Sequence, residues 1–157
     1  MRIREYRPSD AAALSMIFYR SVREVASRCY TPAQIEAWAP RLVETSAQNN
    51  PANTEGRLIL VAVDDADEPI AFGDLEANGH IDHLYVSPDS VGTGAASAIY
   101  NRFESHAREL GLTRLYVEAS ECAVPFFERK GYVRIRRNEL ALRGVLIHNF
   151  SMEKYIR

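Results

Sequence analysis

The sequence predicts an α/β fold built on a mixed, mostly antiparallel central sheet. Three strand-like runs, at 58–63, 69–76 and 80–86, follow one another with only turns between them. Helical patterns then separate the later strands. A doubly wound parallel sheet would instead alternate strand and helix throughout. We therefore expect a single α/β domain over residues 1–157, with about four helices flanking the sheet.

The N-terminal part predicts one strand and two helices. Residues 2–6 alternate as in a strand, and apolar side chains then recur at helical spacing after a cap at Ser9 or Asp10. Thr31 and Gln34 form a capping-box pattern around a proline at the first helical position, which predicts a second helix ending by Pro40. The polar, asparagine-rich stretch 44–56 predicts a loop.

Turn signals and helix ends define the rest of the chain. Asn78-Gly79 predicts a hairpin between the second and third strands of the trio. A helix that starts near Gly94 ends at Gly111, and a short strand at 115–117 follows. Ser120 is expected to cap a helix through Lys130, and the chain finishes with strands at 132–136 and 146–152.

Composition excludes several classes of protein. The 157 residues carry a net charge of −2 without a basic block, which disfavours nucleic-acid binding. No apolar run is long enough to cross a membrane, and the charged N-terminus does not resemble a signal peptide, so we expect a cytoplasmic protein. Cys29 and Cys122 have neither metal-ligand spacing nor a disulfide framework, and each is expected to be a small buried hydrophobe.

The segment from the third strand of the trio into the next helix predicts an anion site. Gly92 and Gly94 flank Thr93, and a backbone without Cβ atoms can turn tightly and let a ligand approach. Ala95 and Ala96 then begin a helix whose first amides have no intrahelical acceptor, which suits a phosphate. No Lys-Ser/Thr pair follows, so this is not a P-loop. A Rossmann fingerprint fits poorly, because it needs a third glycine or alanine where Ser97 stands.

Two segments in this order resemble the GNAT superfamily of acetyl-CoA-dependent N-acetyltransferases. The segment DSVGTG at 89–94 is similar to the family's Arg/Gln-X-X-Gly-X-Gly/Ala block, and SECAVPFFERKGY at 120–132 is similar to its Asn-X-X-Ala-X-X-Leu-Tyr-X-X-X-Gly-Phe block. Three positions depart from the pattern. Asp89 replaces Arg or Gln, Ser120 replaces Asn, and Phe127 replaces the tyrosine that often protonates the leaving thiolate.

The resemblance implies acetyl-CoA as cosubstrate and a set of residues that bind it. The pyrophosphate would lie at Gly92 to Ala96. The pantetheine arm would run along the strand 80–86 and bind the backbone of Leu84, Tyr85 and Val86, with one amide facing the thioester oxygen. Ser120 and Phe127 would border the arm.

For the general base, the strand 80–86 and its neighbour supply Asp82, His83 and Glu76. Strand periodicity predicts that His80 and Asp82 share one face and that His83 lies on the other. Asp82 is the first candidate as base or water-positioning group, with His83 and Glu76 as alternatives. Because Phe127 has no hydroxyl, Tyr132 and Tyr85 are the candidate substitutes for the acid. No metal site is expected.

The resemblance implies transfer of an acetyl group to a primary amine of a small molecule, peptide or protein. Tyr30 and Trp38 are candidate walls of the amine pocket, and Arg20 and Arg23 are expected to be solvated helix charges. A homodimer is a possible assembly. The alternatives are a non-catalytic acyl-CoA-binding module, favoured by Phe127 and Asp89, and a nucleotide-binding regulatory domain.

Overall fold

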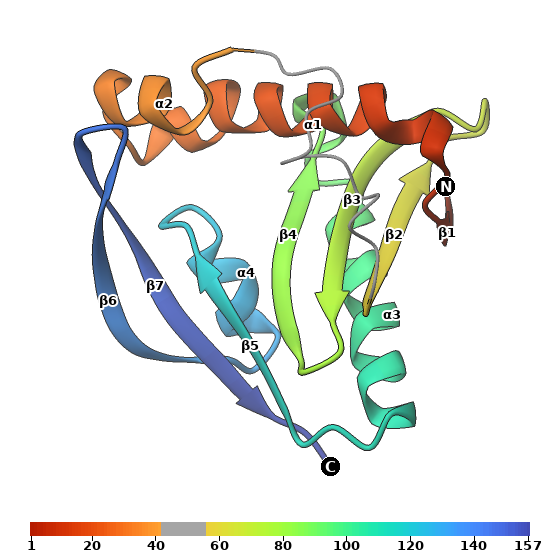
Figure 1. Ribbon diagram of the computed structural model, residues 1–157. Helices are drawn as coiled ribbons and strands as arrows, with labels where there is room; N and C mark the ends of the chain where they lie inside the picture. The colour runs from red at the N-terminus through yellow and green to blue at the C-terminus, as the bar shows by residue number, and fades with distance from the viewer. Residues whose placement is uncertain (42–55) are drawn as a thin grey trace.

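The computed structural model describes residues 1–41 and 56–157 (Figure 1). The strands are β1 (Arg2–Glu5), β2 (Arg57–Val63), β3 (Pro69–Glu76), β4 (His80–Val86), β5 (Arg114–Ala119), β6 (Val133–Leu142) and β7 (Val145–Tyr155). The α-helices are α1 (Ala11–Glu24), α2 (Pro32–Trp38), α3 (Ala95–Glu109) and α4 (Val124–Arg129). One sheet joins all the strands in the order β1-β2-β3-β4-β5-β7-β6, and every pair is antiparallel except β4–β5. The predicted class is therefore confirmed.

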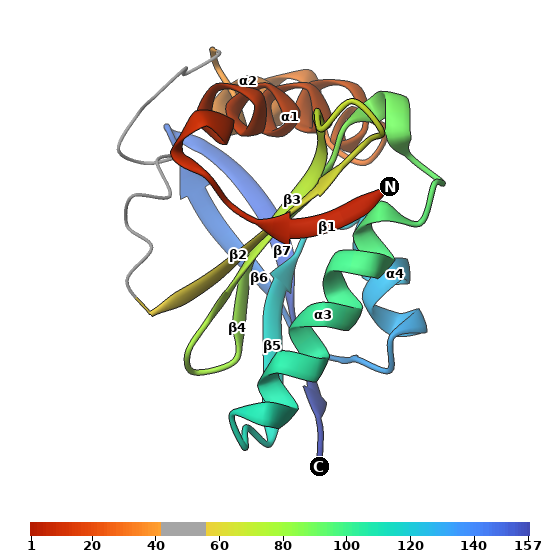
Figure 2. The same cartoon turned by 90° about the vertical axis from the view of Figure 1, so that its right-hand side faces the viewer.

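The helices cover the two faces of the sheet. Alternate residues of β2 point to opposite faces, as strand geometry requires. Leu60 packs in the core cluster beneath α3 and α4, whereas Val61 packs against Leu14 and Ile17 of α1. Figure 2 shows α3 and α4 together on one side of the sheet and α1 and α2 across its upper end. We call these the α3 face and the α1 face.

The sheet opens between β4 and β5. These parallel strands pair only at His80 with Tyr116 and at Ile81 with Val117. Beyond that point they diverge (Figure 1), and within the described residues β4 has no ladder partner on its β5 side. The free edge exposes backbone donors and acceptors on β4 that a ligand can satisfy. The opening lies next to α1 and α2.

A β-bulge distorts β4 at this opening. Asp74 of β3 pairs with His83, but Leu75 pairs with Ile81, so Asp82 is an extra residue in β4. The bulge corrects the expectation that Asp82 and His83 lie on opposite faces, because an inserted residue breaks the two-residue alternation. The strands also approach closely here. A Cβ at Gly73 would lie 2.8 Å from the His83 carbonyl oxygen, so this position requires glycine.

Several element boundaries differ from the sequence prediction. The last two strands are longer than expected and form one hairpin, whose turn residues Arg143 and Gly144 both have positive φ, as in a type I′ turn. Helix α4 begins at Val124 rather than just after Ser120, because Pro125 favours the first turn of a helix. The predicted loop 44–56 lies almost wholly outside the described residues.

The two cysteines form a disulfide, which corrects the expectation of two separate buried thiols. The Cys29–Cys122 bridge joins residues 93 positions apart. It ties the segment between α1 and α2 to the turn that precedes α4. Sequence spacing could not indicate this pairing, because only the tertiary fold brings the two segments together. Within the described ranges, no helix has the length and apolar character needed to span a bilayer.

Candidate active site

A cavity of about 370 Å³ occupies the opening between β4 and β5, and we call it the cleft. Its β4 wall includes Asp82, His83, Leu84 and Tyr85, all of which the sequence singled out. Its other walls come from β5, the turn before α4, the β6–β7 hairpin and helices α1 and α2. Among them are Ser120, Phe127, Tyr30 and Trp38, which the sequence also named, and Phe18, Glu118, Leu140, Leu142 and His148, which it did not.

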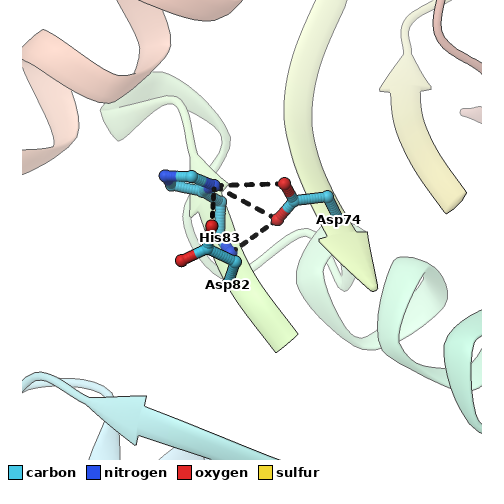
Figure 3. Close-up of side chains that lie close together, drawn as sticks. All are labelled: Asp74, Asp82 and His83. Atoms are coloured by element: carbon cyan, nitrogen blue, oxygen red, sulfur yellow. Dashed lines mark hydrogen bonds and ion pairs between the residues drawn. The ribbon is translucent and has the colours of Figure 1, made fainter. Parts of the chain in front are cut away.

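His83 is held by a buried carboxylate in the cleft wall. Its Nδ1 lies 3.1 Å and 3.2 Å from the two carboxylate oxygens of Asp74, and its backbone amide donates to Asp74 Oδ1 at 2.7 Å. Figure 3 shows the other ring nitrogen of His83 on the side away from Asp74. Burial alone would lower the pKa of His83, but the hydrogen bond to Asp74 and the charges of Asp74 and Asp82 raise it. Nε2 is therefore the nitrogen that can exchange protons with a ligand.

Arg57 joins the two acids of this network. Its Nη1 donates to Asp74 Oδ2 and to Asp82 Oδ2, each at 2.8 Å. Burial opposes ionisation of Asp74, but the hydrogen bonds and charges of His83 and Arg57 lower its pKa. Asp74, Asp82 and His83 have ligand atoms close enough together for a metal ion, but the guanidinium already provides the positive charge between the two carboxylates. The arrangement is a histidine–carboxylate pair supported by arginine.

Sequence reasoning missed Asp74. The available signal was an aspartate within the apolar run PIAFGDLE of β3, one residue after a glycine. Asp74 is only 7% exposed, and a buried carboxylate requires partners. Those partners come from β2 and β4, so the pairing depends on the strand register, which the sequence alone does not show.

Glu76, the third candidate base, lies outside the cleft lining. It accepts from His80 Nδ1 at 2.7 Å, and the other ring nitrogen of His80 lies 2.9 Å from Glu118 on β5. Burial would lower the pKa of His80, but the hydrogen bond to Glu76 and the charge and hydrogen bond of Glu118 raise it. His80 therefore bridges β4 and β5 where the strands begin to separate.

Aromatic rings form the cleft wall beneath α1 and α2. Phe18 contacts Tyr85 edge-on with ring centroids 5.0 Å apart, and Tyr30 contacts Trp38 in the same way at 5.6 Å. The Tyr30 hydroxyl donates to the backbone carbonyl of His148 at 2.8 Å and accepts from the Glu121 amide at 2.9 Å. These two bonds to backbone groups fix the position of the Tyr30 hydroxyl in the cleft wall.

The Gly-X-Gly turn borders a second cavity, of about 510 Å³, which we call the cradle. Gly92 and Gly94 have φ of 82° and 85°, a conformation that L-residues with a Cβ rarely adopt. A Cβ at either position would meet nothing within 4 Å, so the space beside both glycines is open. The first intrahelical bond of α3 is donated by Ala98 to the Gly94 carbonyl, so the preceding amides of the helix have no intrahelical acceptor.

A cation completes the cradle. Lys130 lines it together with Val86, Ala95 and Ala96, and its Nζ lies 3.2 Å from Asn101 Oδ1 on α3. Thr93 is not part of the lining, and its hydroxyl donates to the Ser90 carbonyl. Free amides, a helix N-terminus and a lysine together suit a phosphorylated ligand.

Comparison with known proteins decides the family. Residues 26–154 match the acetyltransferase (GNAT) domain family. The chain belongs to the GNAT acetyltransferase family. It is 34% identical over 152 residues to YafP of Escherichia coli K12, an uncharacterized N-acetyltransferase, with 97% of this chain and 94% of that protein aligned. It is 29% identical over 138 residues to the peptidyl-lysine N-acetyltransferase YjaB of the same organism, covering 88% of this chain and 86% of YjaB.

A solved structure supports the same assignment. The crystal structure of a GCN5-related N-acetyltransferase, also titled aminotransferase, class-II, from Rhodopseudomonas palustris superimposes with a TM-score of 0.90 at 34% identity. The match covers 99% of this chain and 95% of that one. This GNAT chain is an acyltransferase, and its cleft and cradle lie on the elements that carried the sequence resemblance.

The structure explains one of the three departures from the GNAT pattern. The negative charge of Asp89 is paired with Arg20 of α1, which donates to both of its carboxylate oxygens at 2.8 Å and 3.2 Å. This ion pair lowers the pKa of Asp89 and offsets its charge beside the cradle. Arg20 is therefore more than a solvated helix charge, and Arg23 likewise pairs with Glu36.

The other two departures lie in the cleft wall. Ser120 and Phe127 both line the cleft, and Phe127 is 3% exposed. Tyr132 and Tyr85, the candidate substitutes for the tyrosine that Phe127 replaces, are both poorly placed to act as the acid. Tyr132 borders neither cavity, and its hydroxyl is buried without a hydrogen-bond partner among the described residues. Tyr85 lines the cleft, but burial and the charges of Asp82 and Asp74 raise its pKa far above the usual tyrosine value.

Proposed function

We propose that this GNAT enzyme transfers the acetyl group of acetyl-CoA to an unhindered primary alkyl amine such as a lysine side chain. One observation carries the proposal. Strand β4 borders both cavities, with the histidine–carboxylate pair of His83 and Asp74 at the cleft and Val86 at the phosphate-type cradle. A yncA acetyltransferase from Salmonella typhimurium, which shares this fold with a TM-score of 0.72, was solved with acetyl-CoA.

The cradle residues fit the phosphates of the cosubstrate. We assign the pyrophosphate to the open space beside Gly92 and Gly94, where it accepts from the first amides of α3. Lys130 adds a charge-assisted contact. The pantetheine arm then follows the unpaired edge of β4 at Leu84, Tyr85 and Val86, whose backbone groups replace those of a neighbouring strand.

His83 is the group that we assign as general base. Bound acetyl-CoA supplies a thioester carbonyl, and the amine nitrogen forms the new C–N bond as the C–S bond breaks. The acceptor ammonium must lose two protons. Solvent takes the first, and His83 Nε2 accepts the second as the C–N bond forms, while Asp74 holds Nδ1–H and stabilises the resulting imidazolium. Asp82 is the weaker candidate, because Arg57 donates to its carboxylate at 2.8 Å. Asp82 instead adds negative charge that attracts the ammonium form of the acceptor.

The cleft walls support the choice of acceptor. Phe18, Trp38 and Tyr85 provide apolar contact for an unbranched methylene chain, and carboxylates stand near its inner end. A lysine side chain has this shape, with four methylene groups and a terminal ammonium. The name of the relative YjaB, a peptidyl-lysine N-acetyltransferase, agrees with this acceptor.

The test is acetylation of matched acceptors by the purified protein, measured by mass spectrometry and by release of CoA thiol. A peptide with one internal lysine and a blocked N-terminus should be acetylated faster than the same peptide with that lysine replaced by alanine and a free N-terminus. His83→Gln should lower turnover on the order of 100-fold or more while CoA affinity persists. Near-native turnover of that variant would contradict the base assignment, and preference for the α-amine would contradict the acceptor.

A further inference from the structure

A second histidine–carboxylate pair faces the cleft from the wall opposite His83. His148 lies on β7, and its Nε2 is 2.6 Å from Glu121 Oε2 in the turn before α4. Its side chain is 13% exposed, and it lines the cleft together with Ser120 and Phe127. The base and acceptor assignments above make no use of this pair.

Strand alternation places the two pairs on opposite faces of the sheet. Residues 148, 150 and 152 of β7 share a face. Met152 and Phe150 pack in the core beneath α3 and α4, so the His148 side chain is on the α3 face. Ile147, one residue earlier, packs with the α2 cluster on the other face. His83 lies among Phe72 and Tyr85 on the α1 face. The cleft thus has one histidine on the acceptor side and another on the side of the cradle.

The reaction needs a proton donor on the cradle side. Breaking the C–S bond leaves a thiolate on the pantetheine arm, and this thiolate must be stabilised or protonated. Helix α4 borders both cavities, since Phe126 lines the cradle and Phe127 lines the cleft, and neither ring carries a hydroxyl. Tyr85 is on the acceptor face and Tyr132 borders neither cavity. Of the described residues that line the cleft on the α3 face, His148 is the one with an ionisable ring.

We propose that His148, positioned by Glu121, is the general acid that protonates the departing thiolate; this inference rests on the proposed acetyl transfer. The imidazolium keeps Nε2–H on Glu121 and donates its Nδ1 proton to sulfur as the C–S bond breaks. The acceptor ammonium first loses one proton to solvent, the neutral amine passes a second proton to His83 as its C–N bond forms, and both histidines return to their starting states by exchange with solvent. Atoms and charges balance, because the two protons lost by the ammonium pass to solvent and to His83, and the sulfur gains the proton that leaves His148.

The surroundings of His148 hold its ring in place. Its backbone carbonyl accepts from the Tyr30 hydroxyl at 2.8 Å, and its ring lies against those of Tyr30 and Phe150. Glu139 is its cross-strand neighbour on β6 and is paired with Arg137 at 2.9 Å. Glu121 is therefore the carboxylate bonded to the ring.

The first test needs neither an acceptor nor turnover. The thiol of bound CoA is titrated through the ultraviolet absorbance of its thiolate, in the native protein and in His148→Gln. A free thiol titrates near roughly 8.5. An imidazolium within reach should lower the pKa of the bound thiol by about one to two units in the native protein but not in His148→Gln. His83→Gln is the matched control and should retain the lowered pKa. Equal thiol pKa values in the native protein and His148→Gln would overturn the proposal.

The second test uses Phe127→Tyr as a rescue, because it restores a phenol at the family's position. His148→Gln should lower kcat by roughly 10² to 10⁴. Adding Phe127→Tyr should raise kcat at least about tenfold in the His148→Gln background and much less in the native or His83→Gln background. Equal effects in all three backgrounds would overturn the role of His148. Glu121→Gln provides a milder variant if His148→Gln folds poorly, and it should weaken the thiol shift.

The two proposals fail differently. If no amine is acetylated but the thiol pKa of bound CoA is lowered only when His148 is present, the proposed transfer reaction fails and the thiolate site stands. If acetylation proceeds and the thiol titration is insensitive to His148, the reaction stands and this inference fails.

Discussion

Replacing Asp74 with asparagine tests the electrostatic assignment of the cleft. The interaction that matters joins His83 Nδ1 to Asp74 Oδ1, which are 3.1 Å apart. At an effective dielectric of about 20, two unit charges at that distance attract by about 5 kcal/mol before screening. Asp82, 3.6 Å from Nδ1, keeps part of the field in the variant, and the His83 side chain is 32% exposed. A net loss of about 1 to 3 kcal/mol of attraction between the two groups remains.

The sign of the pH effect follows from the direction of the pKa shift. The pKa of His83 is raised from its ordinary 6.5, so in the native protein the neutral base forms only as pH rises through that higher value. Asp74→Asn removes the main groups that raise this pKa and leaves the burial that lowers it. The acid limb of kcat/KM should therefore move to lower pH.

The same substitution should also lower the plateau rate. Asp74 accepts from the His83 backbone amide at 2.7 Å as well as from the ring. An asparagine whose oxygen keeps the backbone bond presents its NH₂ to Nδ1, and the ring proton then moves to Nε2. This is the wrong tautomer for a base, so kcat should fall on the order of 100-fold or more.

The free energy of unfolding also depends on the ion pair between His83 and Asp74. The pKa of Asp74 is lowered from 3.8, so the ionised carboxylate stabilises the fold above pH 3.8. This stabilisation is lost as pH falls through the lowered pKa. The pKa of His83 is raised, so its interaction with Asp74 stabilises the fold fully below pH 6.5, and this stabilisation is lost as pH rises through the raised pKa. Asp74→Asn should therefore cost about 1 to 3 kcal/mol of unfolding free energy, most clearly between pH 4 and 6.5.

The assay is kcat/KM against pH from 5.5 to 9.5, with denaturant unfolding at two pH values. Asp65→Asn is the matched control, because it removes one carboxylate from a fully exposed turn side chain. It should leave both the pH profile and the stability unchanged. A native pH profile and a near-native rate in Asp74→Asn would refute the assignment of His83 and Asp74 as a coupled pair.

Three further predictions follow from the site and the fold. Gly94→Glu should weaken CoA binding on the order of 100-fold by calorimetry, whereas Gly111→Glu, at another positive-φ glycine with open space, should leave affinity unchanged; equal losses would contradict the cradle assignment. Asp82→Asn should lower kcat by only about tenfold, less than His83→Gln, and the reverse order would assign the base to Asp82. Replacing both cysteines with serine should cost about 2 to 4 kcal/mol of unfolding free energy in non-reducing denaturant titrations, and no loss would show that the bridge does not form in solution.

Local signals determined most of the fold. The capping box at the start of α2 forms as expected, with the Gln34 amide donating to Thr31 Oγ1 at 3.2 Å and the Thr31 amide donating to Gln34 Oε1 at 2.9 Å. The bounds of β3 and β4 match the predicted 69–76 and 80–86. These features depend on residues within a few positions of one another, which is why periodicity and turn chemistry were sufficient. The glycine turn of the cradle is of the same kind, because its glycines and the helix start are consecutive, whereas Lys130 joins it from a distant segment.

The tertiary structure decided how the candidate residues combine. The sequence placed Asp82, His83 and Glu76 on adjoining strands, but the bulge brought Asp82 and His83 around Asp74, and Glu76 pairs with His80 instead. The Cys29–Cys122 bridge, the pairing of Arg20 with Asp89 and the His148–Glu121 pair likewise join segments far apart in the chain. A one-residue change of register moves a side chain to the opposite face, and neither register nor helix packing is encoded locally. The sequence alone therefore predicted the family and the glycine turn of the cradle, and the packing of distant segments decided which groups surround His83 and His148.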